Sequence, residues 1–318
     1  AAMGAVVHDR GPNSEIYSSY LDYLEKAQRA SGKPVFLVAN RQGSGADELA
    51  ISSTYQGLPV IDGVTQFLVG ARCLLAYRDF QQRAVMKCDV TDQQKVDYWK
   101  RQLQDCDYVS ESLASELLRD FGIPMIQSLE VSSLDELQTA VLNVGFPLVL
   151  KTAVQGIDHK TEVGGVILNI SDQPQLQDAY EDLLQRLGPA VTVAPMADNN
   201  GVEMILGVSR DEQFGPTVVV GFGGIYAEIL SDVAVMLPPF DSAEVKRVLK
   251  SLSMYPLLEG VRGGSPLDID SYCDVAAKMS AIALALSDSV VEIDINPVRL
   301  GVKGCIGLDA LVVQEQKN

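Results

Sequence analysis

The sequence predicts an α/β protein of two parts, in which a short parallel α/β segment precedes a larger α+β domain. Two observations support this prediction. Over the first eighty residues, short β-branched runs alternate with segments in which apolar residues recur at helical spacing. After about residue 110, strands and helices follow one another without strict alternation, which is typical of a domain built on an antiparallel sheet.

The first part has the rhythm of a parallel sheet with helical crossovers. We expect strands at residues 5–7, 34–38 and 58–61, and helices at 15–30, 47–55 and 64–77. The first strand begins within a few residues of the N-terminus, and three strands make a thin sheet. The segment is therefore either a small flavodoxin-like unit or the later part of a larger domain. We assign residues 1–85 to this domain and the polar residues 86–109 to a linker that carries one helix.

Residues 110–318 form the predicted second domain. Its first helix, at 110–121, has Ser110 or Ser112 as its N-cap and ends at Gly122. Further helices are expected at 134–144, 175–187, 243–252 and 271–286. Strands are expected at 146–150, 166–170, 190–196, 203–208, 216–221, 227–238, 292–296 and 305–309.

The overall composition is that of a globular protein with a sizeable core, because 47% of the 318 residues are hydrophobic and 21% are charged. The net charge of −17 argues against a nucleic acid or an anionic membrane as the main partner. Five scattered cysteines without a C-x-x-C pair favour reduced thiols over a disulfide framework or a zinc site. Neither a membrane-spanning apolar run nor a signal pattern is present, so we expect a cytoplasmic protein.

A hairpin with an unusual loop stands at residues 146–170. The first strand delivers Lys151, and His159, one of two histidines in the chain, follows with Lys160. The glycine pair Gly164–Gly165 then leads into the second strand. Lysine supplies a point charge, and glycines let backbone N–H groups approach phosphate oxygens. The loop is therefore a candidate anion site, and a solvated hairpin loop is the alternative that these residues alone leave open.

A second candidate lies around Ala194-Pro195-Met196 and the nearby Glu203. Backbone groups at a strand end beside a methionine can clamp a flat heterocycle, and a carboxylate can accept hydrogen bonds from ribose hydroxyls. The alternative is that Met196 belongs to the core, where methionine is common. The glycine cluster that ends in Gly223–Gly224 and the segment around Arg262 are further candidates for phosphate contacts.

The third candidate is the segment VEIDINP, with Asp309 expected on the following strand. Alternation along a strand places Glu292, Asp294 and Asn296 on one face. Oxygen ligands that converge from two strands suit Mg²⁺, which a few protein oxygens hold together with nucleotide phosphates. A solvated strand face is the alternative.

The motifs KTAVQGIDHKTEVGGV, RDEQFGPTVVVGFGG and EIDINPV resemble the ATP-grasp signatures of the NDP-forming acyl-CoA synthetases, relatives of succinyl-CoA ligase. ESLASELLRDFGIP resembles the opening helix of that domain. The resemblance covers about residues 110–315. The segments VVHDRG, GKPVFLVANR and GLPVIDG resemble the later part of the flavodoxin-like CoA-ligase domain that precedes it in fused family members.

The resemblance implies a set of residue roles. His159 matches the phosphohistidine of the ATP-grasp part, and Lys151 matches the lysine on the nucleotide phosphates. Glu203 matches the carboxylate on the ribose. Asn296 and Asp309 match the magnesium ligands, to which we add Asp294. Arg262 is a candidate for neutralising the moving phosphoryl group. The expected cofactors are therefore ATP or ADP with Mg²⁺.

The family's CoA-binding domain, and the domain with its other phosphohistidine, have no counterpart in this sequence. The chain therefore resembles a C-terminal piece or one subunit of an acid–thiol ligase, whose CoA and small carboxylic acid would bind through further domains or a partner subunit in a homo- or hetero-oligomer. An ATP-grasp carboxylate–amine ligase, which needs no histidine, is a second hypothesis. A non-catalytic nucleotide-binding piece is a third.

Overall fold

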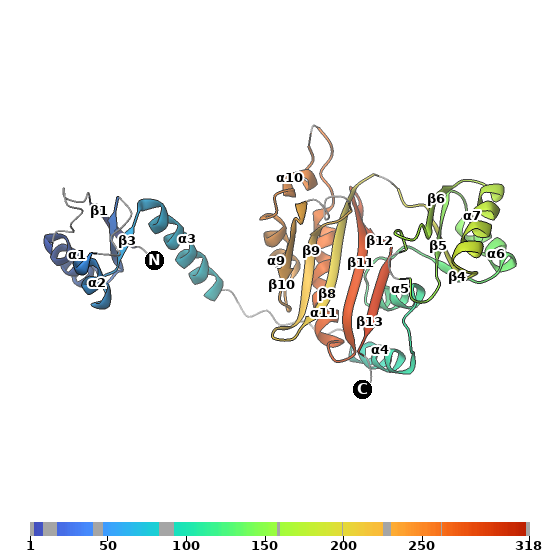
Figure 1. Ribbon diagram of the computed structural model, residues 1–318, viewed down its shortest axis with the longest axis horizontal. Helices are drawn as coiled ribbons and strands as arrows, with labels where there is room; N and C mark the ends of the chain where they lie inside the picture. The colour runs from blue at the N-terminus through green and yellow to red at the C-terminus, as the bar shows by residue number, and fades with distance from the viewer. Residues whose placement is uncertain are drawn as a thin grey trace. The chain divides into compact units, whose positions relative to one another are not determined.

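The computed structural model describes residues 3–8, 18–40, 47–82, 92–157, 160–198, 200–224, 230–261 and 263–315. The chain divides into two compact units, Ala1–Val85 and Met86–Asn318 (Figure 1). The first unit has a parallel sheet and the second has antiparallel sheets, which confirms the predicted fold class.

The first unit contains a three-stranded parallel sheet in the order β1-β2-β3. The buried residues Leu24, Leu37 and Ala50 form a small core between this sheet and its helices. Asp47 caps α2, because its side chain accepts hydrogen bonds from the N–H groups of Leu49 and Ala50. The elements are β1 (Gly4–His8), α1 (Ser18–Ser31), β2 (Val35–Ala39), α2 (Glu48–Tyr55), β3 (Val60–Asp62) and α3 (Val64–Gln81).

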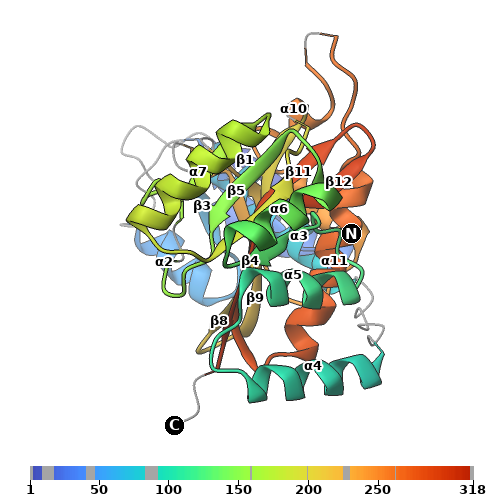
Figure 2. The same cartoon turned by 90° about the vertical axis from the view of Figure 1, so that its right-hand side faces the viewer.

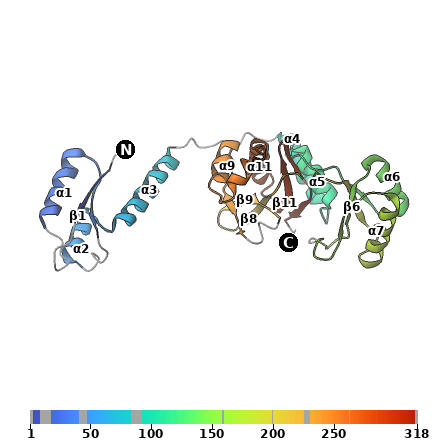
Figure 3. The same cartoon turned by 90° about the horizontal axis from the view of Figure 1, so that it is seen from above.

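The larger sheet of the second unit has six strands in the order β10-β9-β8-β11-β12, with β13 also paired to β11. Every pairing in it is antiparallel. Helices α9 and α11 pack together on one side of this sheet, as Figure 3 shows. The strands are β8 (Val202–Asp211), β9 (Gly215–Phe222), β10 (Val233–Met236), β11 (Val290–Gly301), β12 (Gly304–Gly307) and β13 (Ala310–Gln314), and the helices are α9 (Ser242–Leu249), α10 (Tyr255–Leu258) and α11 (Ile269–Ala285).

The smaller sheet of the second unit has four antiparallel strands in the order β4-β7-β5-β6. Helices α6 and α7 contact it, and Figure 2 faces this part of the molecule. It has an apolar core of its own, separate from that of the larger sheet. Its elements are β4 (Leu129–Val131), α6 (Leu134–Val144), β5 (Leu148–Thr152), β6 (Val166–Ile170), α7 (Gln173–Arg186) and β7 (Val191–Pro195).

Helix α5 (Glu111–Asp120) begins where the sequence predicts, because Ser110 accepts a hydrogen bond from the N–H of Leu113. Helix α4 (Gln93–Asp105) differs from the expected linker at 86–109. Its Val96, Trp99 and Leu103 are buried in the core of the larger sheet, and the Trp99 indole donates to Asp120 over 2.8 Å. The helix is therefore an integral part of the second unit.

The described residues also bear on two sequence-based expectations, the state of the cysteines and the lack of a membrane-spanning segment. The described cysteines Cys73, Cys106, Cys273 and Cys305 are all free thiols. Among the described residues, no helix is both long and apolar enough to cross a bilayer.

Candidate functional site

Two adjoining cavities lie where the smaller sheet faces the larger one. The first has a volume of about 390 Å³ and the second about 410 Å³, and both are within the size range of small-ligand sites. Thr161, Asn296 and Asp309 line both cavities. The two spaces are therefore neighbouring parts of one site.

The first cavity has an apolar end between the two sheets. Because side chains alternate along a strand, Val149 and Lys151 of β5 both face this space. Ala194 and Met196 line it as expected, and the Met196 N–H donates to the carbonyl of Pro147 over 2.9 Å. Apolar side chains complete the walls, among them Ile126, Val166, Leu168, Pro297 and Leu308. This end can enclose a flat, largely apolar group.

Four charged side chains meet at the other end of the first cavity, where it adjoins the second. The Lys151 amine lies 3.1 Å from Asp309 and 3.2 Å from Glu111, and donates to the Leu308 carbonyl over 2.8 Å. The Lys160 amine lies 2.5 Å from Glu111 and 3.4 Å from Asp309. Two lysines and two carboxylates therefore alternate in a compact arrangement, which we call the charge cluster.

Burial and charge act in opposite directions on Lys160. Its burial lowers the pKa of the amine, because the charged form loses water. Asp309 and Glu111 act against this, and together they hold the Lys160 pKa above its ordinary value. The amine is therefore a cation across the physiological pH range.

Glu203 lies on β8 directly opposite Arg299 of β11, at the wall of the first cavity. The Arg299 guanidinium donates to the Glu203 carboxylate over 2.7 Å. Gly224 has φ +58° and leaves room for this carboxylate, since a Cβ there would stand 2.3 Å from Glu203 Oε2. The N–H of Gly223 donates to the Glu203 carbonyl over 2.8 Å. Gly223 and Gly224 therefore support Glu203 and do not themselves line either cavity.

The expected metal ligands Asp294, Asn296 and Asp309 all line the second cavity. Ile293 and Ile295 point to the core on the opposite side of β11, as the alternation predicts. Asp309 was expected on a strand, but it lies in the short connection after the end of β12 and before the start of β13. Two carboxylates and an amide oxygen fit a hard cation that also binds ligand phosphates, and the described residues contain no larger group of acidic, cysteine or histidine side chains that could hold a metal.

Gly164 and Gly165, expected from the sequence to contact phosphate, have their N–H groups turned to backbone carbonyls in this structure. Their N–H groups donate to the carbonyls of Thr161 and Lys160, over 3.1 and 2.7 Å. A Cβ at Gly165 would stand 2.6 Å from the Thr152 side chain. The two glycines therefore form a tight turn after Lys160, with their donors already used within it.

Two of the expected catalytic residues, His159 and Arg262, lie outside the described residues. Lys160, which follows His159, is described and belongs to the charge cluster. Glu111 was not among the residues singled out from the sequence. An acidic residue after a serine N-cap is an ordinary helix start, and its contacts with Lys151 and Lys160 span 40 and 49 positions.

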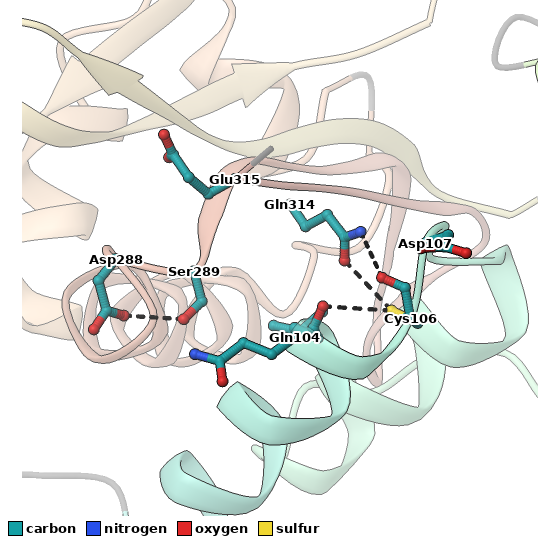
Figure 4. Close-up of a pocket in the computed structure, with 8 residues that line it drawn as sticks. Gln104, Cys106, Asp107, Asp288, Ser289, Gln314 and Glu315 are labelled. Carbon is teal, nitrogen blue, oxygen red and sulfur yellow. Dashed lines mark hydrogen bonds between the residues drawn. The ribbon is translucent and has the colours of Figure 1, made fainter. Parts of the chain in front are cut away.

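A third cavity, of about 500 Å³, lies outside this site between α4 and the start of β11. Figure 4 shows its lining, in which the Gln314 amide donates to the Cys106 carbonyl over 2.8 Å. Two of its three carboxylates are paired, Asp288 with Lys100 and Glu315 with Arg210. None of the site residues expected from the sequence lines it.

The sequence profile of the ATP-grasp domain family matches residues 102–313. The beta subunit of ADP-forming acetate–CoA ligase I from Pyrococcus furiosus is 33% identical over 213 residues, which are 64% of this chain and 90% of that subunit. Trans-feruloyl-CoA synthase FCS1, from an unknown prokaryotic organism, is 34% identical over 218 residues. The match covers 65% of this chain and 31% of that protein, so the chain spans less than a third of that longer relative.

Solved structures resemble about 70% of the chain. A Pyrococcus horikoshii protein has a TM-score of 0.64 at 29% identity, and the match covers 71% of this chain and all of that one. The acetyl-coenzyme A synthetase 1 of Ca. Korarchaeum cryptofilum, in complex with coenzyme A and Ca-AMPCP, has a TM-score of 0.63 at 30% identity and covers 69% of this chain and 98% of that one. The chain therefore belongs to the ATP-grasp family, in the group that contains the beta subunits of ADP-forming acetate–CoA ligases.

Proposed function

We propose that the second unit binds Mg²⁺ with ATP or ADP and transfers a phosphoryl group to and from His159. The observation that carries this proposal is the meeting of Lys151, Glu203 and the acidic edge of β11 around two adjoining cavities. The apolar end suits a nucleobase, and Glu203 suits the ribose. Lys151 then stands where the phosphates would lie.

The residues of the second cavity fit the magnesium ion of such a nucleotide. Asp294, Asn296 and Asp309 would hold it with the phosphates. When bound, Mg²⁺ neutralises charge on the transferred phosphoryl group. Phosphoryl transfer depends mainly on position and charge, so the protein's task is to hold Lys151 and the carboxylates in place. A structure of the Korarchaeum relative is described as holding Mg-AMPPCP with a phosphohistidine segment pointing towards the nucleotide site.

We propose that this transfer serves an acid–thiol ligase reaction, in which an acid, CoA and ATP give acyl-CoA, ADP and phosphate. The relatives are named as subunits or whole chains of CoA ligases, and this chain matches only a part of the longer ones. CoA and the acid would then bind through further domains or a partner subunit. Residues 1–85 would be part of the preceding CoA-ligase domain.

Labelling with [γ-³²P]ATP tests the transfer directly. The chain is incubated with Mg-ATP, and we expect one acid-labile, base-stable phosphate per molecule, the behaviour of a phosphohistidine. The His159→Ala variant loses the label because a neutral imidazole is the acceptor. His8→Ala changes the other histidine of the chain and keeps the label. A label that survives in His159→Ala would refute the proposal.

A further inference from the structure

Glu111 joins two parts of the site that come from distant segments. It stands in the first turn of α5. Its Oε1 lies 3.2 Å from the amine of Lys151 on β5, and its Oε2 lies 2.5 Å from the amine of Lys160 in the loop after His159. Each carboxylate oxygen therefore holds one lysine.

Glu111 and both lysines are largely buried, so each charge depends on its partners for stabilisation. Its side chain is 7% exposed, and those of Lys151 and Lys160 are 10% and 13% exposed. Removal of one partner from a buried ion pair is strongly destabilising, because it leaves an uncompensated charge. The two lysines are therefore fixed by a carboxylate that is itself buried and has little freedom to move.

Asp309 shares the same lysines but has a different environment. Its side chain is 29% exposed, and it lines both cavities, whereas Glu111 lines only the second. Asp309 is thus the carboxylate of the charge cluster that a ligand-bound cation reaches more readily. If Asp309 turns to a cation, Glu111 is the carboxylate that stays with both lysines.

We propose that Glu111 is a positioning residue of the phosphoryl-transfer site, which keeps Lys151 at the nucleotide cavity and holds Lys160, the residue that follows His159 in the sequence, while Asp309 serves the metal. This inference rests on the proposed function. Glu111 itself touches neither the nucleotide nor the phosphoryl group. It acts through the two amines.

The Glu111→Gln variant tests this role, because it removes the charge and nearly keeps the shape. We expect the rate of phosphate labelling to fall by about a hundredfold, because a misplacement of the positioning groups by about 1 Å can cost that much in rate. The Kd for Mg-ADP, measured by calorimetry, changes far less, because Lys151 lies on β5 at the wall of the first cavity and keeps its hydrogen bond to the Leu308 carbonyl. Glu111→Asp restores the charge and recovers part of the rate. Glu116→Gln makes the same chemical change at an exposed position of the same helix and has no effect.

Amine reactivity gives a second readout that does not depend on phosphoryl transfer. The chain is treated with an acetylating reagent, and the modification of Lys151 and Lys160 is measured by mass spectrometry. Both amines react severalfold faster in Glu111→Gln than in Glu116→Gln, because each loses one of its two carboxylate partners. Unchanged reactivity together with an unchanged labelling rate would overturn the inference and leave the proposed function standing. A folded wild-type chain that takes no label would refute the proposed function, while the reactivities still decide whether Glu111 holds the amines.

Discussion

Lys151 is a buried cation at the meeting point of the two cavities, held by Asp309, Glu111 and a backbone carbonyl. The Lys151→Met variant keeps the length of the side chain and removes its charge. We expect the Kd for Mg-ADP to rise about tenfold to a hundredfold, because a hydrogen bond to a charged group contributes about 1.5–3 kcal/mol. Calorimetry measures this change.

The control for this variant is Lys303→Met, since Lys303 is an exposed residue in the turn between β11 and β12. Its affinity for Mg-ADP stays at the wild-type value. If Lys151→Met binds Mg-ADP as tightly as this control, Lys151 has no contact with the phosphates.

Gly224 offers a test of Glu203 that leaves the carboxylate in the sequence. In Gly224→Ala, the new methyl group would stand 2.3 Å from Glu203 Oε2, so the carboxylate must leave the cavity wall. Gly215→Ala is the matched control, because Gly215 also has a positive φ, +76°, with nothing within 4 Å of the new atom. Both variants lose about 1–2 kcal/mol of stability from backbone strain.

Only Gly224→Ala is expected to weaken Mg-ADP binding, because only there does the added atom disturb Glu203. Thermal unfolding measures the shared loss of stability, and calorimetry measures the difference in affinity. Equal affinities in the two variants would mean that Glu203 does not contact the ribose.

At the residue scale, the sequence identifies the polar side chains that strands bring to the cavities, because alternation is a local rule. Lys151, Asp294 and Asn296 are examples. It does not identify Glu111, whose partners lie 40 and 49 positions away. Gly164 is a residue that the sequence singles out but whose role it leaves open. A glycine in a loop is compatible with a phosphate cradle and with a closed turn, and the loop sequence does not reveal that its N–H donates to the Thr161 carbonyl.

At the scale of single elements, α4 is the helix whose polar sequence least indicates that it packs against a core. Trp99 is 1% exposed, whereas its neighbour Tyr98 is 45% exposed. We expect Trp99→Ala to lower the stability of the second unit by about 3–5 kcal/mol, the usual cost of removing a large buried side chain. Tyr98→Ala, at the adjacent position, should cost much less. Denaturant unfolding of both variants measures the difference, and similar losses would mean that α4 does not stabilise the unit.

The helices that are easiest to predict from the sequence are those with N-capping residues and a C-terminal glycine. Ser110 and Ser133 cap α5 and α6, and Gly145 ends α6 with a positive φ. The polar composition of residues 86–109 predicts a linker, although α4 lies within this range. The spacing of Val96, Trp99 and Leu103 is nevertheless that of one helix face, and this pattern could have revealed its packing.

For the whole molecule, the site residues are confined to the second unit. The described residues that line the two cavities lie between Tyr108 and Leu311, and the second unit begins at Met86. We expect a fragment of residues 86–318 to fold and to bind Mg-ADP within about twofold of the full chain. Circular dichroism and calorimetry measure this. A fragment that folds but binds much more weakly would mean that the first unit contributes to the site.

At this scale the sequence predicts the change from a parallel to an antiparallel sheet, because the rhythm of elements differs between the two parts. It does not predict that the second unit has two sheets with separate cores. Strand order depends on pairing between distant segments, such as β8 with β11. Periodicity within one segment contains no information about that partner.

The smaller sheet is a continuous insertion, since all its strands and helices lie between Leu129 and Pro195. The chain therefore leaves the larger body once, after Ile126, and returns once, at Ala197, and both residues line the first cavity. A molecule bound there touches both crossings at the same time. Its arrival would hold the two crossings in place, so hydrogen exchange should slow more at the crossings than within either core.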